Sequence, residues 1–353
     1  MAEPVLWRPY TLRGTTFRNR AWMSPMCQYS SRDGFPTDWH RTHYPSRAVG
    51  GASLVLFEAT AVSPVGRISP ADAGLWSPDH ADAYRPITAA VAAAGAVPGV
   101  QLGHAGRKAS TRAPWHGRGW VPPHEGGWQP VAPSAVPFDG LPAPVALSTV
   151  DLDRVVADFV NATRFALRAG FGVVELHAAH GYLLHQFLSP LSNRRTDHFG
   201  GDLAGRMRFP LTVADAVRRV WPAERPLLVR VSATDWVEGG WTLAETVVFA
   251  KELAAIGVDL VDVSSGGSAA DASIPVGPGY QVPLAAEIRR QAGLAVGAVG
   301  MIETPAAAAE VLTSGDADVV LVGRPLLRDP YWPLRAPDAP RDAWPVQYHR
   351  AIA

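Results

Sequence analysis

The sequence predicts a single (β/α)8 TIM barrel from three observations: the length of the chain, the alternation of its elements and one unusually long connection. The chain has 353 residues, of which 47% are hydrophobic and 18% are charged, as in globular proteins. Short apolar runs alternate with longer segments of helical periodicity, which indicates parallel strands joined by crossover helices. A doubly wound open sheet is the structural alternative. No Gly-x-Gly-x-x-Gly motif follows any predicted strand, which weakens the dinucleotide-binding form of that alternative.

The predicted strands are short runs of apolar and β-branched residues. In chain order they are Ala21–Met26, Ala52–Thr60, Val97–Gly103, Val173–Ala178, Leu227–Ser232, Asp259–Ser265, Leu294–Gly300 and Ala317–Arg324. In a barrel their C-terminal ends meet at one rim, where the following loops build the active site.

Three of the intervening segments carry the clearest helical signals. In Leu152–Gly170, apolar residues recur along one helical face and the final glycine ends the pattern. Thr242–Gly257 opens with a capping threonine, has Glu245 three residues later and closes on a glycine. Thr304–Gly315 begins with Thr-Pro, which is a cap followed by a first-turn proline.

One connection is longer than an ordinary barrel loop. Residues 107–150 separate the third predicted strand from its helix and are rich in Pro, Gly and Trp. Loops of this length are usually functional or disordered, and the tryptophans argue against disorder, so we expect a lid over the barrel mouth. We therefore expect one domain over residues 1–353, with the lid at 107–150 and a C-terminal tail at 335–353.

Charge and cysteine content argue against several classes of protein. Lys plus Arg and Asp plus Glu both number 32, a balance that argues against nucleic acid or an anionic membrane as a partner. We expect neither a signal peptide nor a membrane span, since no segment has the required apolar pattern. The single cysteine, Cys27, excludes a disulfide framework and cysteine-ligated zinc or iron–sulfur centres, and suggests a reducing, cytoplasmic compartment.

Polar residues accumulate at the predicted C-terminal ends of the strands. They are Ser24, Cys27, Glu58, Thr60, Gln101, His177, Arg230, Ser264 and Arg324. One such residue would mean little, but their accumulation at one rim of a barrel predicts an active site there.

The last two strand ends indicate a phosphate site. Gly300, Gly323 and Arg324 place small residues and a guanidinium where barrels commonly hold a phosphate. A helix start near Pro325 would add backbone N–H donors. Tight turns between strand and helix are the alternative explanation of these glycines.

Arg230 strengthens the case for a phosphorylated cofactor. It lies inside the fifth predicted strand, where its permanent charge is costly unless it is paired. It can act as a fixed cation beside developing negative charge. A structural ion pair with Glu58 or Glu175 is the alternative.

A pair of histidines and a tyrosine follow the fourth predicted strand. His177 and His180 have no third ligand at a suggestive spacing, so the sequence supports a metal site only weakly. Their rings can instead donate hydrogen bonds to a substrate oxygen, and Tyr182 can supply a proton. The alternatives are a metal-dependent barrel hydrolase that uses His177 and His180, and a structural role for Tyr182 as a loop cap. Cys27 can equally be an ordinary buried cysteine.

Several motifs together resemble the Old Yellow Enzyme family of FMN-dependent ene-reductases, in its bacterial branch of xenobiotic reductases and thermophilic-like enzymes. The longest is the segment from His177 to Gly201, HAAHGYLLHQFLSPLSNRRTDHFGG. The motifs MSPMCQY at 23–29, DWH at 38–40, QLGHAGRK at 101–108 and VGR at 322–324 are similar to the family as well. The resemblance covers nearly the whole chain.

The resemblance implies non-covalently bound FMN at the barrel mouth and no metal. The residues implied to hold FMN are Ser24, Pro25, Met26, Ala61, Gln101, Arg230, Gly300, Gly323 and Arg324. Cys27 is implied to contact the flavin and tune its potential, and Lys108 matches a family lysine near the flavin edge.

The resemblance also implies the reaction. NADPH would deliver a hydride to FMN and leave, and an α,β-unsaturated carbonyl or nitro compound would then be reduced at its C=C bond in a ping-pong sequence. His177 and His180 would bind the substrate oxygen, Tyr182 would protonate Cα, and Tyr29 would contact the substrate.

The C-terminal tail resembles one that, in some members of the family, carries an arginine into the active site of a neighbouring subunit. Arg350 is the candidate here, and it implies a homo-oligomer, either a dimer or a tetramer. A flavin-binding barrel without ene-reductase activity is the remaining alternative.

Overall fold

A closed barrel of parallel strands forms the centre of the molecule in the computed structural model, which describes residues 4–352. The strand order is β10-β11-β12-β3-β4-β5-β8-β9, so strands consecutive in the chain are neighbours in the barrel. The strands are β3 (Ala21–Met23), β4 (Leu54–Ala61), β5 (Val97–Gly103), β8 (Val173–Ala178), β9 (Leu227–Ser232), β10 (Leu260–Ser264), β11 (Ala295–Ala298) and β12 (Val319–Val322). The predicted TIM barrel is confirmed, and the open-sheet alternative is wrong.

Strands β5, β8 and β9 have the predicted bounds, whereas several others end earlier than predicted. Strand β3 stops at Met23, shortly before Pro25, which has no N–H for a sheet ladder. Ser24 and Cys27 therefore follow the strand rather than end it. Gly300 and Arg324 likewise lie beyond the ends of β11 and β12.

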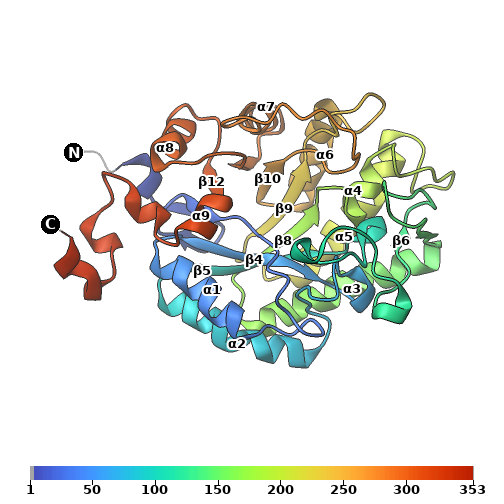
Figure 1. The fold of residues 1–353 in the computed structure, drawn as a ribbon. Helices are drawn as coiled ribbons and strands as arrows, with labels where there is room; N and C mark the ends of the chain where they lie inside the picture. Colours follow the sequence, from blue (N-terminus) through green and yellow to red (C-terminus); the bar gives the residue numbers. More distant parts are fainter. Residues whose placement is uncertain (1–3, 353) are drawn as a thin grey trace.

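Helices surround the barrel as an outer layer (Figure 1). They are α1 (Asp38–Val49), α2 (Pro78–Ala93), α3 (Thr149–Ala169), α5 (Leu203–Val220), α6 (Leu243–Ile256), α7 (Val282–Ala292) and α8 (Pro305–Thr313), with the short α4 (Leu183–Leu188) and α9 (Arg324–Arg328) after β8 and β12. Within residues 4–352, none of these helices combines the length and the apolar character needed to cross a bilayer.

The helix caps follow the predicted chemistry, with one shift. Thr242 and Glu245 form a capping box on α6, and Gly257 ends that helix with φ 98°. Thr304 caps α8 by accepting the N–H of Ala307. Helix α3 begins before the predicted Leu152, because Ser148 forms a capping box of its own with Asp151.

The hairpin of β1 (Tyr10–Leu12) and β2 (Thr15–Phe17) packs against the N-terminal end of the barrel. Its side chains join an apolar cluster from the barrel strands that we call the lower interior. This cluster consists of Leu12, Phe17, Trp22, Leu54, Leu56, Val173, Leu228, Leu260, Val319 and Leu321. The lower interior supplies a packed base for the polar residues above it.

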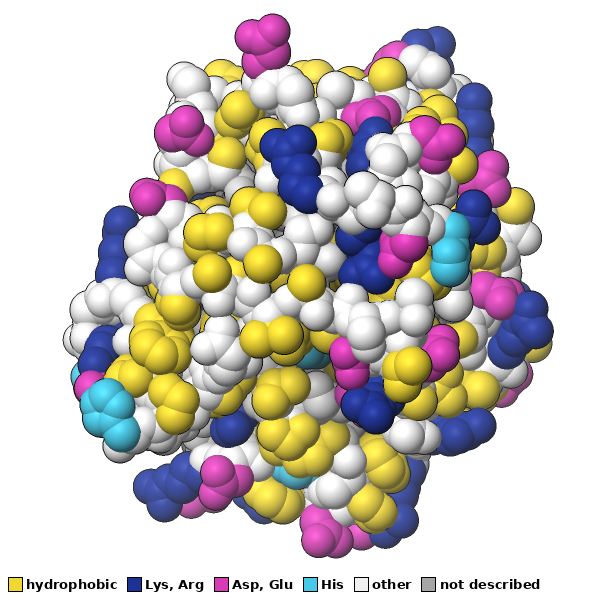
Figure 2. All heavy atoms as spheres, turned by 90° about the vertical axis from the view of Figure 1, so that its right-hand side faces the viewer, with side chains coloured by type: hydrophobic (Ala, Val, Ile, Leu, Met, Phe, Trp, Pro, Cys, Tyr) yellow, Lys and Arg dark blue, Asp and Glu magenta, His cyan; other side chains and the backbone are white. Residues whose placement is uncertain are grey.

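The segment 107–150 lies on the side of the barrel away from both described ends of the chain (Figure 1). It contains short 3-10 turns and the strand pair β6 (Val131–Ala132) and β7 (Val145–Ala146). The indole N–H of Trp128 donates to Val65 O at 2.9 Å, which anchors the segment to the barrel body. On this face, hydrophobic, basic and acidic side chains are mixed (Figure 2).

Candidate active site

Above the lower interior, the barrel strands carry polar side chains that we call the upper interior: Gln101, Glu175, His177, Arg230 and Asp262. Parallel register aligns His177, Arg230 and Asp262 on neighbouring strands β8, β9 and β10. Gln101 donates its side-chain N–H to Glu175 at 2.8 Å. All five side chains are buried, so any charge among them is strongly affected by its neighbours.

Arg230 is paired, but not with Glu58 or Glu175, the two partners that the sequence offered as the alternative to a functional cation. Its Nε lies 3.2 Å from Asp262 Oδ2, and its Nη1 donates to Ser24 Oγ at 3.0 Å. Glu58 instead contacts α1, where it accepts the Tyr44 hydroxyl at 2.9 Å. The Arg230 guanidinium therefore joins β9, β10 and the loop after β3.

The carboxyl groups of the upper interior resist ionisation. Burial raises the pKa of Glu175 to about 8, with the nearby Asp262 adding to the effect. Burial also raises the pKa of Asp262 to about 6, and the charge of Arg230 opposes that rise. The layer therefore carries a permanent cation whose counter-charge is incomplete.

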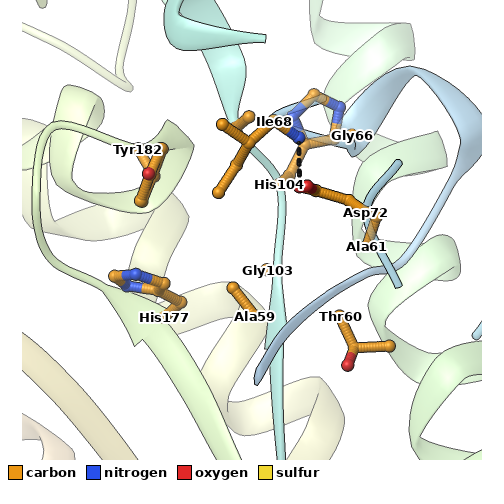
Figure 3. A pocket seen from close by; sticks show the side chains of 11 residues that line it. Ala59, Thr60, Ala61, Gly66, Ile68, Asp72, Gly103, His104, His177 and Tyr182 are labelled. Carbon is orange, nitrogen blue, oxygen red and sulfur yellow. Dashed lines mark hydrogen bonds between the residues drawn. The ribbon is translucent and has the colours of Figure 1, made fainter. Parts of the chain in front are cut away.

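His177, His180 and Tyr182 come together at the C-terminal end of β8, as the sequence predicts. The His177 ring centroid lies 5.1 Å from that of His180 and 4.9 Å from that of Tyr182, with the rings edge to face. His177 and Tyr182 line one small cavity with residues of β4 and β5 (Figure 3). The site thus places an imidazole and a phenol side by side.

Both imidazoles are neutral at neutral pH. Burial lowers the pKa of His177 and of His180 well below the ordinary value, and the charge of Arg230 lowers both further. His177 Nδ1 accepts the N–H of Ala179 at 3.3 Å, which leaves the ring proton on Nε2. His180 Nε2 lies 2.7 Å from Ser264 Oγ. These histidines can polarise an oxygen by hydrogen bonding without carrying charge themselves.

The turn that carries His180 and Tyr182 is tightly constrained. His180 has φ 59°, a left-handed conformation that is costly for a residue other than glycine. A Cβ on Gly181 would lie 2.2 Å from Gly267 O, so this close approach requires glycine. Lys108 Nζ donates to the carbonyls of His180 and Gly267, both at 2.9 Å. Lys108 therefore holds the turn in place.

A second contact supports the same turn from below. The N–H of Gly181 donates to His185 Nδ1 at 2.9 Å, and His185 Nε2 lies 3.0 Å from the carboxylate of Asp235. Asp235 also accepts the Ser189 hydroxyl at 2.6 Å. The buried set His185, Ser189 and Asp235 fixes the backbone that positions Tyr182.

Tyr182 keeps its proton. Burial raises the pKa of its phenol well above the ordinary value, with Cys27 and Tyr29 adding smaller effects. Among the described residues, its hydroxyl donates no hydrogen bond to another protein group. A protonated phenol without a protein acceptor is suited to giving its proton to a bound molecule.

Cys27 and Tyr29 lie in the loop after β3, beside a buried carboxyl. Burial raises the pKa of the Cys27 thiol well above its ordinary value, with Asp72 and then Glu58 adding. Tyr29 has φ 47°, another strained position at the site. Asp72 accepts the N–H of Ile68 at 2.7 Å (Figure 3), and burial raises its pKa to about 8.

The predicted phosphate site is a cavity of about 170 Å³ at the ends of β11 and β12. Gly300, Gly323, Arg324 and Arg230 all line it, together with Ser264 and Gln281. Gly300 has φ 117°, and a Cβ there would meet Gln281 Nε2 at 2.7 Å. Among the described residues, Arg324 forms no hydrogen bond or ion pair. A guanidinium without a partner in such a cavity fits a phosphate.

The upper interior also has polar atoms without protein partners. Glu175 Oε2 and Asp262 Oδ1 are buried without a hydrogen bond from the protein, and Asp262 Oδ2 has only its ion pair with Arg230. Buried polar atoms normally have a hydrogen-bond partner, and a bound polar ligand would supply the partner here. Together with the phosphate cavity, these residues fit FMN.

The metal alternative and the C-terminal arginine can both be compared with the structure. Among residues 4–352, no three His, Cys, Asp or Glu side chains are grouped as metal ligands would be. Arg350 is exposed in the turn Val346–Ala351. The C-terminal end of the chain lies on the side of the barrel away from the segment 107–150 (Figure 1). This end therefore does not approach the site of its own chain.

The fold and the site together are those of a TIM barrel whose mouth fits a flavin nucleotide. Residues 5–341 match the NADH:flavin oxidoreductase / NADH oxidase family, and the chain belongs to this family. The predicted Old Yellow Enzyme resemblance is confirmed. The chain is therefore a flavin oxidoreductase of this family, with FMN as its cofactor and NADPH as its electron donor.

Individual relatives match along nearly their whole length. An NADPH dehydrogenase of Geobacillus thermodenitrificans is 47% identical over 351 residues, which cover 98% of each chain. Among solved structures, morphinone reductase is 29% identical with a TM-score of 0.80, over 95% of this chain and 89% of that one. An old yellow enzyme homologue from Zymomonas mobilis is 30% identical with a TM-score of 0.78, over 97% of both chains.

Sequence reasoning missed three residues at this site. Asp262 alternates with Ser264 along β10, so its inward direction was available from the period of two. His104 lines the cavity beside His177, and burial lowers its pKa to about 4. Asp72 lies in a loop without periodicity, and no sequence signal places it beside Cys27.

Proposed function

We propose that this enzyme reduces the activated C=C bond of α,β-unsaturated carbonyl compounds and of α,β-unsaturated nitro compounds. The pairing of His177 with Tyr182 supports this most directly, since their ring centroids lie 4.9 Å apart at the wall of one cavity. A neutral imidazole N–H and a protonated phenol are the two groups that such a reduction needs on the protein side.

In this proposal the protein binds, polarises and protonates. Bound FMN would supply the two-electron chemistry between NADPH and the substrate. The Nε2–H of His177 and the ring of His180 hold the substrate oxygen where negative charge develops. Tyr182 then gives its proton to Cα, and Tyr29 limits the space for the substrate. The two substrates share one site, which implies ping-pong kinetics.

We assign the cofactor contacts on the same basis. The residues proposed to hold FMN are Ser24, Pro25, Met26, Cys27, Ala61, Gln101, Arg230, Gly300, Gly323 and Arg324. Arg230 would favour the anionic form of the reduced ring, because its charge is buried and only partly compensated. The phosphate would lie in the cavity at Gly300 and Arg324.

Tyr182→Phe tests the proton donor. We expect the reoxidation of reduced enzyme by 2-cyclohexen-1-one to slow by roughly 100-fold or more, since the general acid is lost. Reduction by NADPH should keep its rate, because that half-reaction needs no proton from Tyr182. Anaerobic stopped-flow absorbance of each half-reaction measures both rates. An equal loss in both halves, or none in reoxidation, contradicts the assignment. Bleaching by NADPH without return by enone would identify a flavoenzyme of other specificity.

We further propose that Arg350 completes the site of a second copy in a dimer or tetramer. Arg350 is exposed, and the C-terminal end of the chain lies away from the segment 107–150 (Figure 1), so a role in another subunit is open to it. Arg350→Ala should then raise the KM for the enone. Unchanged KM and kcat in a stable oligomer would count against this role.

A further inference from the structure

NADPH differs from NADH by a single phosphate on the adenosine 2′-oxygen. This phosphate lies at the end of the nucleotide far from the nicotinamide that donates the hydride. The hydride of either nucleotide must reach the barrel mouth near His177 and Tyr182. The adenosine end therefore has to lie elsewhere. We infer that Arg118, in the segment 107–150, binds the 2′-phosphate of NADPH and gives the enzyme its preference for this donor.

A large cavity connects the barrel mouth with Arg118. It has a volume of about 850 Å³ and lies between the segment 107–150 and the body of the barrel. Ile68 and Tyr182 line both this cavity and the small one that contains His177. Arg118, Gly119, Phe138 and Asp139 line the same cavity from the segment 107–150. A dinucleotide that enters at Tyr182 can thus extend beneath this segment.

The charge of this cavity suits a phosphate. Its lining includes the cations Lys108, Arg112 and Arg118 and the single anion Asp139. The excess of cationic over anionic side chains gives the cavity a positive net charge, which attracts a nucleotide that carries several negative charges. The side chains of the upper interior are buried, so the 2′-phosphate of the nucleotide would bind in this larger cavity instead.

The three cations of the cavity are not equally free. Lys108 Nζ is engaged by the carbonyls of His180 and Gly267, both at 2.9 Å. Arg112 forms an ion pair with Glu125 at 2.6 Å. The guanidinium of Arg118, in contrast, forms no hydrogen bond, ion pair or ring contact with any residue in the range 4–352. Arg118 is therefore the cation of this cavity that is free to bind a ligand.

The local backbone presents Arg118 to the cavity. Gly117 and Gly119 flank it with φ 87° and 121°, and neither has an atom within 4 Å of where a Cβ would lie. Trp115, in the same loop, contacts Tyr29 with perpendicular rings whose centroids lie 5.7 Å apart. A guanidinium in this position can bind a phosphate through two parallel N–H···O bonds.

The inference is tested on the reduction of bound FMN by NADPH or NADH, which requires no enone. For Arg118→Ala we expect the Kd for NADPH to rise roughly tenfold, as for loss of one charge-assisted contact. The Kd for NADH and the limiting rate of reduction should not change. Arg118→Lys should lose less affinity than Arg118→Ala, because it keeps the charge. The matched control is Arg85→Ala, an exposed arginine on the outer helix α2.

A binding measurement without turnover separates this inference from the proposed function. Adenosine 2′,5′-bisphosphate, titrated into the FMN-loaded enzyme by calorimetry, should bind more weakly to Arg118→Ala, whereas 5′-ADP should bind both forms equally. A loss of NADPH affinity matched by an equal loss of NADH affinity overturns the inference, and so does an unchanged Kd for NADPH. If enone reduction fails while the NADPH effect is found, the proposed function is wrong and this inference stands.

Discussion

The lower and upper interiors of the barrel are built from the same strands but differ in kind. Strand β9 contributes Leu228 to the lower interior and Arg230 to the upper, and β10 contributes Leu260 and Asp262 in the same way. The two layers are about 7 Å apart along the strands. In the lower interior every side chain is hydrophobic and the indole N–H of Trp22 is the one buried polar group without a partner, whereas the upper interior contains buried carboxyl groups and a guanidinium.

This difference separates stability from chemistry within one architecture. Apolar packing in the lower interior stabilises the barrel by removing surface from water. The upper interior instead concentrates an arginine and carboxyl groups with raised pKa values, which cost free energy to bury. Such conflicts are expected at functional sites, and the packed layer beneath offsets them.

Among these predictions, Arg230→Met should have the largest effect on stability and FMN content. The substitution extends the apolar character of the lower interior into the upper one. In Arg230→Met, Asp262 loses its cation at 3.2 Å, and we expect destabilisation by about 3–5 kcal/mol, as for other broken buried pairs. FMN should also be lost. Urea unfolding and the flavin-to-protein absorbance ratio measure the two effects. The double variant Arg230→Met with Asp262→Asn should regain stability but not FMN.

Leu228→Ala is the control from the lower interior, two residues away on the same strand. It removes a fully buried side chain and should cost about 2–5 kcal/mol through the cavity it leaves. Purified protein should nevertheless carry its full FMN content. If Leu228→Ala loses flavin as readily as Arg230→Met, the two layers are not functionally distinct and the comparison fails.

The sequence predicted the regular parts of this fold because local rules decide them. Strands β5, β8 and β9 have the predicted bounds, and Thr242 and Gly257 delimit α6 as expected. The rim residues His177, His180 and Tyr182 were predicted together because consecutive residues at a strand end stay together. The β1–β2 hairpin was missed, since its strands are too short to show a period.

Pairings between distant residues were harder to predict. Glu58 and Glu175 were the alternative partners considered for Arg230, but register between β9 and β10 makes the partner Asp262. Glu58 points to α1 because the pairing of β4 with β5 shifts between Phe57 and Ala59, and a bulge of this kind cannot be read from period-two alternation. Asp72 depends on the path of a loop.

Asp72 and Asp262 offer a finer comparison, between two buried carboxyl groups of which one has a cation. Asp262 lies beside Arg230 and its pKa is raised to about 6, whereas Asp72 forms no ion pair with any described residue and its pKa is raised to about 8. Burial is the main cause of both shifts. The pH dependence of stability should therefore come more strongly from Asp72.

The sign follows from proton binding. Between about pH 4 and pH 8, folded protein keeps the Asp72 proton that the unfolded chain releases, so the free energy of unfolding falls as pH rises through this window. Asp72→Asn should remove up to about 1.4 kcal/mol per pH unit of that slope. Urea unfolding of both proteins at pH 5, 6 and 7 measures it. Parallel slopes would mean that Asp72 ionises near its ordinary pKa, and that a carboxyl group at this mouth needs no partner to stay charged.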